Sequence, residues 1–274
     1  MGAMGCSSRA ISMFLDALQS GSHWIIKVKK IIFSEHLLDP MRFIHAITIV
    51  ILALMPFAQC QHTAEEWFNK GNDFYGQGKY DEAINAFNES IKINPNLMGT
   101  WNNKGAALAR QYRYDEAIKA LDEAIRIEPN YAGAWNNKGA VLTSQGNYNK
   151  AIKSFDEAIR LNTNYSKAWN NKGIVLGKQG LYDEAIKALD ESIWLNPNYA
   201  EFWSNKGFFL GKQGSYDGAI TALDQAIKLN PRYVNAWNNK GLVLQSLGRS
   251  IEANDAFYRA RELWNATALR AEGE

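Results

Sequence analysis

The sequence predicts an all-α solenoid, in which six helix-turn-helix hairpins stack in a row between residues 64 and 267. Three observations lead to this fold class. The sequence repeats with a period of 34 residues, each period carries two runs of apolar and small residues at intervals of four and three, and a glycine separates the two runs in most periods. Such intervals place residues on one face of a helix. A single hairpin cannot bury both of its apolar faces, so the hairpins are expected to stack.

The segment before the repeats, residues 41–60, has the pattern of a signal peptide or a membrane anchor. Met41 is followed by an arginine, and residues 43–58 are mostly apolar but too short to span about 30 Å of hydrocarbon comfortably. Small residues, Ala58 and Cys60, stand where a signal peptidase would recognise its cleavage site. The alternative is a retained anchor that holds the repeats at a membrane through residues 43–58.

Residues 1–40 show neither sustained helical periodicity nor strand alternation. Because signal peptides normally begin at the chain terminus, these residues are predicted to be an over-extended start or a disordered segment. The expected location is therefore secreted, extracytoplasmic or membrane-anchored.

Each repeat unit is counted from three residues before its first tryptophan, and the place of a residue in its unit is its unit position. Position 4 is tryptophan, position 8 is glycine and position 11 is a large apolar residue, as in Trp135, Gly139 and Leu142. These intervals predict the first helix of each hairpin. The units span residues 64–97, 98–131, 132–165, 166–199, 200–233 and 234–267, and residues 268–274 form a short tail.

A turn and a second helix follow in each unit. Gly146 and its equivalents stand where a chain reversal favours a residue that tolerates positive φ. Alanine at position 20, a large apolar residue at 24 and a small residue at 27 repeat the four-three interval, as in Ala151, Phe155 and Ala158. Proline at position 32 ends the second helix in four of the units.

The residues at these positions resemble the tetratricopeptide repeat family, whose pattern of Trp, Leu, Gly, Tyr, Ala, Phe, Ala and Pro at fixed offsets is matched through residues 64–267. The resemblance implies a right-handed superhelix with a concave face, and a role as a protein or peptide-binding scaffold. The family pattern does not select a ligand, because one fold serves many functions.

Position 6 of the first helix is asparagine in every unit. It lies about 200° around the helix from the tryptophan, so it is expected to point away from the packed face, into the concave surface. An amide carries a donor and an acceptor and can pair with a peptide backbone of any sequence. The row resembles the asparagine ladder in the repeat region of O-linked N-acetylglucosamine transferases. The alternative is that the amides only hydrogen-bond neighbouring helices. The residues are Asn69, Asn103, Asn137, Asn171, Asn205 and Asn239.

Position 9 shares the surface of the asparagines and becomes apolar toward the C-terminus, in Ile174, Phe208 and Leu242. Exposed apolar groups beside a polar row would take side chains of a bound segment, so units four to six are the predicted specificity region. The alternative is packing against the adjacent helix.

Position 7 is lysine in all six units. The stem of each lysine is expected to cover the tryptophan stripe while the ammonium reaches solvent. Acidic runs such as Asp115 and Glu116 are the expected neutralising groups, and recognition of an acidic partner is the alternative.

Charge and residue types exclude several function classes. Residues 1–61 hold five of the 30 basic and three of the 28 acidic residues, so the repeats are net neutral and nucleic acid is not expected as a partner. All four histidines and both cysteines precede the repeats, and neither a catalytic group nor a metal or other cofactor site is expected within them.

These observations favour a non-catalytic scaffold that holds an extended segment along its concave face. The alternative is a module that recruits substrate for a separately encoded transferase of the glycosyltransferase type. The tail after unit six is too short for the polar capping helix that such arrays use, so self-association through the C-terminal unit is also predicted.

Overall fold

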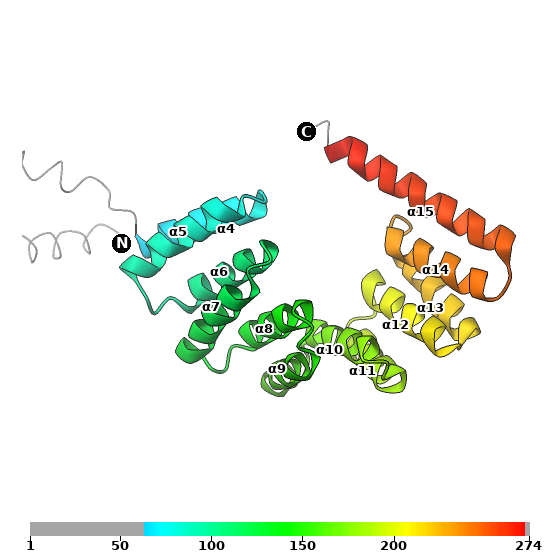
Figure 1. The fold of residues 1–274 in the computed structure, drawn as a ribbon, viewed down its shortest axis with the longest axis horizontal. Coiled ribbons are helices and arrows are strands. Elements are labelled where there is room, and N and C mark those ends of the chain that lie inside the picture. The colour runs from blue at the N-terminus through cyan, green and yellow to red at the C-terminus, as the bar shows by residue number, and fades with distance from the viewer. Residues whose placement is uncertain (1–62, 272–274) are drawn as a thin grey trace, which may run out of the picture. The chain divides into compact units, whose positions relative to one another are not determined.

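The structure, a computed structural model, describes residues 63–271, so the predictions for residues 1–40 and 41–60 lie outside the described residues. Twelve α-helices and no strand occur in this part, and the helices pair in sequence order as hairpins (Figure 1). The all-α fold of stacked hairpins is therefore confirmed. The first helices are α4 (Ala64–Gly76), α6 (Met98–Arg110), α8 (Ala132–Ser144), α10 (Ser166–Lys178), α12 (Ala200–Gln213) and α14 (Val234–Ser246). The second helices are α5 (Tyr80–Ile93), α7 (Tyr114–Ile127), α9 (Tyr148–Leu161), α11 (Tyr182–Leu195), α13 (Tyr216–Leu229) and α15 (Ser250–Ala271).

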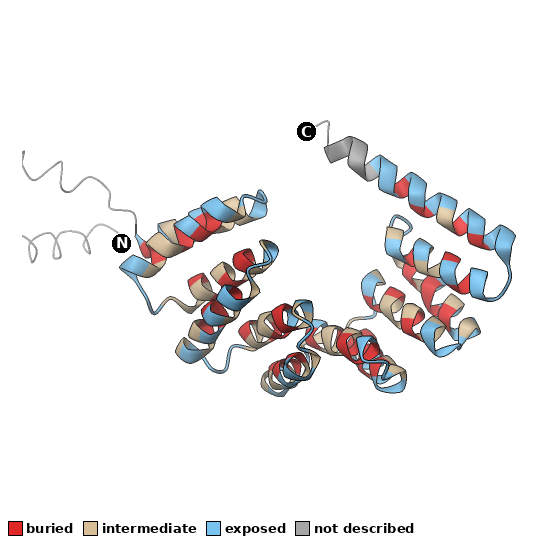
Figure 2. Ribbon diagram, viewed as in Figure 1, coloured by how far each residue is buried: buried red, intermediate tan, exposed pale blue. Residues whose placement is uncertain are grey.

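Each hairpin closes around its position 8 glycine. A Cβ added at Gly139 would lie 2.6 Å from a ring carbon of Phe155, which is buried in the same unit. The absence of a side chain therefore lets the two helices approach closely. Figure 2 shows the buried residues as stripes along the facing sides of the helices, with exposed residues on the outer sides.

Each unit also packs against the second helix of the unit before it. Ile220 of α13, at position 21, packs with Leu244 and Trp237 of α14. Tyr216, at position 17, packs beside Val243, which is buried at position 10 of unit six. Positions 17 and 21 of one unit thus meet positions 4, 10 and 11 of the next, which joins the cores of neighbouring units.

Unit six carries polar residues where the other units face a neighbour. Positions 17 and 21 are Tyr and Ile in units one to five, but Ser250 and Asn254 in unit six. Helix α15 therefore carries polar side chains on the side that faces the next unit in the other repeats, as a capping element requires. Hydrophobic exposure remains at Ile251 and Tyr258, which are 80% and 54% exposed. The polar cap, which was expected to be missing, is thus built partly into α15 itself.

The turn of unit two departs from the glycine pattern. Tyr112 has φ 62°, whereas the equivalent residue in the five other turns is a glycine with positive φ. A left-handed conformation costs a non-glycine residue about 1 kcal/mol.

Tyr112→Gly should therefore raise the free energy of unfolding by about 1 kcal/mol, because the conformation is kept and its steric cost is removed. Urea unfolding followed by circular dichroism measures the change. Gly146→Tyr is the reverse change in the next turn and should be destabilising by a similar amount. A loss of stability in Tyr112→Gly would mean that the edge contact between Tyr112 and Tyr114 outweighs the backbone strain.

Candidate functional site

The inner face of the array is formed by the first helices. Each first helix contacts the first helix of the next unit, while the described second helices make no comparable contacts with one another. The hairpins therefore bend toward the first helices, as the arc of α6, α8, α10 and α12 shows (Figure 1). At 100° per residue, positions 2, 6, 9 and 13 fall on one side of each first helix. These positions are called the inner stripe.

The asparagines of position 6 lie on the inner stripe and bond to the preceding unit. The amide nitrogen of Asn171 donates to the side-chain oxygen of Asn136 at 2.9 Å, and that of Asn205 donates to Asn170 at the same distance. Each of these bonds joins position 6 of one unit to position 5 of the unit before it. The remaining members are Asn137 to Asn102 at 2.9 Å, Asn239 to Ser204 at 3.2 Å, and Asn103 to Asn72, at position 9, at 2.7 Å. Asn69, in the first unit, is exposed.

The acceptors at position 5 are functional residues that the sequence analysis missed. Asn102, Asn136, Asn170 and Ser204 are at most 7% exposed, whereas Asn238, which no unit follows, is exposed. The available signal was the recurring Asn-Asn pair after the tryptophan. The predicted hydrogen bonding to neighbouring helices is thus present, and it uses the donor of each amide.

The side-chain oxygens of the asparagine row remain available to accept hydrogen bonds from a ligand. Within residues 63–266, the side-chain oxygens of Asn137, Asn171 and Asn205 accept no hydrogen bond. The inter-unit bonds fix the orientation of these amides, so their oxygens form an ordered row of acceptors at one-unit spacing. Peptide binding by these residues stays a prediction.

The apolar residues of position 9 also lie on the inner stripe. Ile174 and Phe208 are half-buried, and Leu242 is 48% exposed. The ring of Phe208 packs edge-on to that of Phe209, with centroids 5.0 Å apart. This contact lies within α12, and part of the surface of Phe208 stays accessible, so the peptide-binding role of position 9 stays a prediction.

In units three to six, the lysines of position 7 are neutralised by different carboxylates from those expected. Each ammonium lies 4.7–5.9 Å from the ring centroid of the tryptophan in its own unit. In units three to six it also bonds an aspartate at position 25 of the preceding unit, as in Lys172 with Asp156 at 2.6 Å. The acidic runs serve other partners: Asp115 accepts from Gln145, and Glu116 pairs with Arg113.

The junction of units one and two lacks this ion pair. Position 25 of unit one is Asn88, so the half-buried Lys104 has no carboxylate within ion-pair distance in the described part of the chain. Burial lowers the pKa of Lys104, against a smaller opposing effect of Glu116. The unfolded state then binds more protons than the folded state just below pH 10.5, and stability should rise with pH there.

Asn88→Asp should restore the ion pair and raise the free energy of unfolding by about 0.2–1 kcal/mol at pH 7. The rise in stability toward pH 10.5 should also become smaller, because the new carboxylate favours the charged lysine. Chemical unfolding at several pH values measures both effects. Asn198→Asp, in an exposed loop, makes the same charge change away from Lys104, and equal effects of the two substitutions would contradict the assignment.

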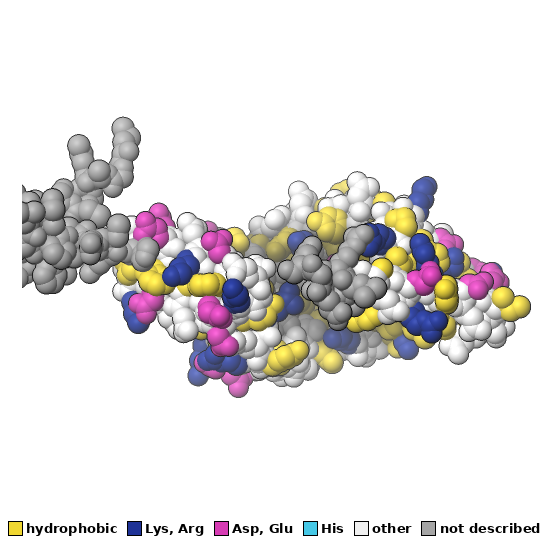
Figure 3. All heavy atoms as spheres, turned by 90° about the horizontal axis from the view of Figure 1, so that it is seen from above, with side chains coloured by type: hydrophobic (Ala, Val, Ile, Leu, Met, Phe, Trp, Pro, Cys, Tyr) yellow, Lys and Arg dark blue, Asp and Glu magenta, His cyan; other side chains and the backbone are white. Residues whose placement is uncertain are grey.

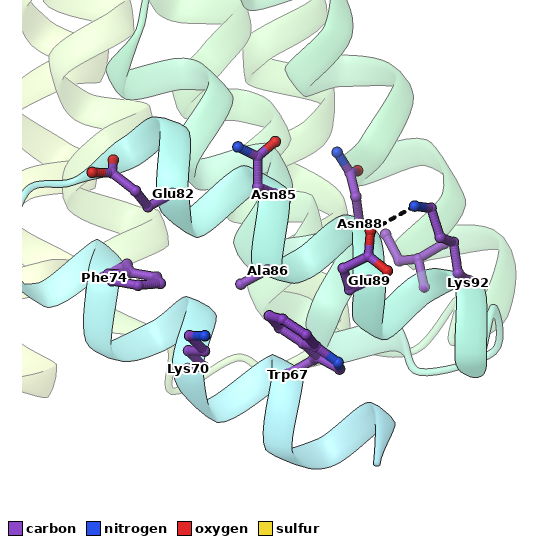
Figure 4. A pocket seen from close by; sticks show the side chains of 10 residues that line it. Trp67, Lys70, Phe74, Glu82, Asn85, Ala86, Asn88, Glu89 and Lys92 are labelled. Atoms are coloured by element: carbon purple, nitrogen blue, oxygen red, sulfur yellow. Dashed lines mark hydrogen bonds and ion pairs between the residues drawn. The ribbon is translucent and has the colours of Figure 1, made fainter. Parts of the chain in front are cut away.

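A groove lies between the two helices of unit one (Figure 4). Its volume is about 580 Å³, and it is lined by Trp67, Lys70 and Phe74 of α4 and by Asn85 and Ala86 of α5. A similar groove of about 430 Å³ occurs in unit six. Both grooves involve positions 4, 7 and 11, which are outside the inner stripe.

The surface of the described repeats mixes charges of both signs with hydrophobic groups (Figure 3). This distribution agrees with the net neutrality of the repeats. None of the helices in the described part is long and apolar enough to cross a membrane.

Solved structures with the same fold are distant in sequence. A crystal structure of MamA is 24% identical, with a TM-score of 0.52 over 62% of this chain and 92% of that chain. PilF of Pseudomonas aeruginosa is 17% identical, with a TM-score of 0.64 over 76% and 97%. YrrB, described as a TPR protein with an unusual peptide-binding site, is 22% identical, with a TM-score of 0.50 over 69% and 98%. Comparison with curated proteins gives no significant match.

Family models identify the repeats directly. Tetratricopeptide repeat models match residues 64–97, 99–131, 132–165 and 166–199, and a TPR repeat model matches residues 210–248. Together these matches cover more than half of the chain, and the four matches between residues 64 and 199 follow the units that the tryptophans define. The chain belongs to the tetratricopeptide repeat family.

Proposed function

We propose that this chain is a non-catalytic scaffold that holds an extended peptide or protein segment along its inner face. The observation that carries the proposal is the row of amide oxygens at Asn137, Asn171 and Asn205, which inter-unit hydrogen bonds hold in fixed orientation. An oxygen acceptor can pair with a backbone N–H group regardless of the side chain that follows. Fixed amides lose little conformational freedom on binding, which favours affinity. The peptide-binding site named for YrrB supports a similar use of this fold.

The test compares two sets of substitutions in a random peptide display experiment. Asn137, Asn171 and Asn205 are changed together to alanine, which removes both the acceptors and the inter-unit bonds. In the matched control, Asn102, Asn136 and Asn170 are changed to alanine, which removes the same bonds from the buried side. Peptide binding should be lost in the first variant, which has no acceptors, and only weakened in the second, which keeps the oxygens but no longer fixes their orientation, after circular dichroism shows that both are folded. Equal binding by both variants would contradict the proposal.

The location is proposed to be extracytoplasmic or membrane-associated, on the basis of the apolar segment at residues 43–58. N-terminal sequencing of the protein from its native source tests this. A mature chain that begins at Gln61 supports a cleaved signal, and a chain that keeps residues 41–60 in the membrane fraction supports an anchor. A chain that keeps these residues in the soluble cytoplasmic fraction contradicts both.

Recruitment of substrate for a separate transferase is the second candidate, favoured by the resemblance of the asparagine row to that of the O-linked N-acetylglucosamine transferases. It requires that the bound peptide also be an acceptor of a glycosyl group. Glycosyl transfer to a selected peptide should then be faster in native extract when the array is present. An unchanged rate of glycosyl transfer would contradict this second candidate and leave the scaffold function as the proposal.

Self-association would involve the hydrophobic groups that α15 leaves exposed, Ile251 and Tyr258. Sedimentation of the wild-type protein and of the Ile251→Ser, Tyr258→Ser variant would measure this. A strict monomer in both samples at high concentration would remove this proposal.

A further inference from the structure

Two lysines on the inner stripe have no acidic partner, unlike the position 7 lysines of the same two units. Lys178 and Lys212 occupy position 13 of units four and five and are exposed. Neither forms an ion pair with any residue of the described repeats. In the same two units, Lys172 and Lys206 at position 7 bond aspartates at 2.6 and 2.5 Å. A cation in the last turn is favoured by the helix dipole, but that preference does not keep carboxylates away.

The two lysines stand one helical turn after the apolar residues of the stripe. Lys178 follows Ile174 by four residues, and Lys212 follows Phe208 by four, so each pair lies on one side of its helix. The ammonium of Lys212 is 5.5 Å from the ring centroid of Phe208. Units one to three lack this combination, because position 9 is asparagine or alanine there. Among the described units, a large apolar group four residues before an unpaired lysine therefore occurs in neighbouring units four and five, whereas unit two has the small Ala106 before Arg110, which donates to the hydroxyl of Tyr75.

The apolar part of this surface is held rigidly by an aromatic cluster. Phe209, 5% exposed, contacts the ring of Phe208 at 5.0 Å and that of Tyr182 of the preceding unit at 6.4 Å. Phe202, at the start of the same helix, stacks on Tyr199 at 5.0 Å. The ring of Phe209, against which Phe208 packs, is thus held against α11.

We infer that units four to six select an extended segment in which acidic side chains stand next to apolar ones. Carboxylates of the segment pair with Lys178 and Lys212, while its apolar side chains contact Ile174, Phe208 and Leu242. Packed helices lie about 8–10 Å apart, which is about three residues of an extended chain, so the acidic and apolar pairs should recur at about that interval. The inference rests on the proposed function, because the backbone of the same segment lies on the asparagine row.

The test uses synthetic peptides in which acidic and apolar residues are paired at this interval, and the same peptides with Asp and Glu replaced by Asn and Gln. Binding to the purified full chain is measured by fluorescence anisotropy. The variant is Lys178→Gln, Lys212→Gln. The matched control is Lys153→Gln, Lys187→Gln, which removes two exposed lysines from position 22 of the second helices, away from the inner stripe.

Acidic peptides should bind about tenfold more weakly to the Lys178→Gln, Lys212→Gln variant than to the wild type and the control, and added salt should weaken the wild-type complex. Neutral peptides should bind all three proteins equally weakly. Equal affinity of acidic and neutral peptides for the wild type, with binding still dependent on the asparagines, overturns this inference and keeps the proposed function. If no peptide of any composition binds, the proposed function fails as well.

Discussion

Replacing Gly177 with alanine is expected to lower the free energy of unfolding by about 2–3 kcal/mol. A Cβ at this position would lie 2.1 Å from a ring carbon of Phe209, and two further ring atoms lie within 2.5 Å. The ring cannot move away easily, because Tyr182 and Phe208 contact it on other sides. Accommodation therefore requires a shift of α12 relative to α10. Urea unfolding followed by circular dichroism measures the loss.

Gly218→Ala is the matched control, since it adds the same methyl group to an exposed position of α13. The nearest atom to its Cβ would be a methyl carbon of Leu210 at 3.6 Å, an ordinary contact. Alanine is the better helix former, so this variant should gain about 0.5 kcal/mol. Similar changes in the two variants would show that the junction of units four and five is loosely packed. The same shift of α12 should also weaken binding of acidic peptides, because it displaces Phe208.

The sequence predicts the hairpins well because their determinants are local. The glycine of position 8, the large residue of position 24 and the turn glycine of position 15 lie within one unit, and helical spacing alone places them together. Gly139 against Phe155 shows this agreement.

Contacts between units are harder to predict, since they depend on how far each hairpin is rotated against the next. The spacing within a unit leaves that rotation open. For this reason the acidic partner of Lys172, Asp156, and the acceptor of the Asn205 amide, Asn170, were not predicted, although both residues of each pair belong to recurring positions. The side-chain changes at the end of the array were visible in the sequence, but their meaning required knowing that positions 17 and 21 face the next unit.

The second large effect is expected at the buried position 5 residues, which accept the hydrogen bonds of the asparagine row. Asn170→Ala should lower the free energy of unfolding by about 1–2 kcal/mol, because Asn170 is 2% exposed and its oxygen accepts the hydrogen bond of Asn205 at 2.9 Å. The substitution leaves the part-buried amide nitrogen of Asn205 without its partner and opens a small space between units four and five. Thermal and urea unfolding of the purified variant measure the change.

Asn238→Ala makes the same change at the same unit position, where no following unit supplies an amide and the side chain is exposed. It should alter stability by less than about 0.5 kcal/mol. A difference between the two variants assigns the cost to the inter-unit bond, since helix propensity changes equally in both. If Asn170→Ala were as mild as Asn238→Ala, the row would not be held by these bonds. The amide oxygens would then lack the fixed orientation on which recognition of an extended backbone depends.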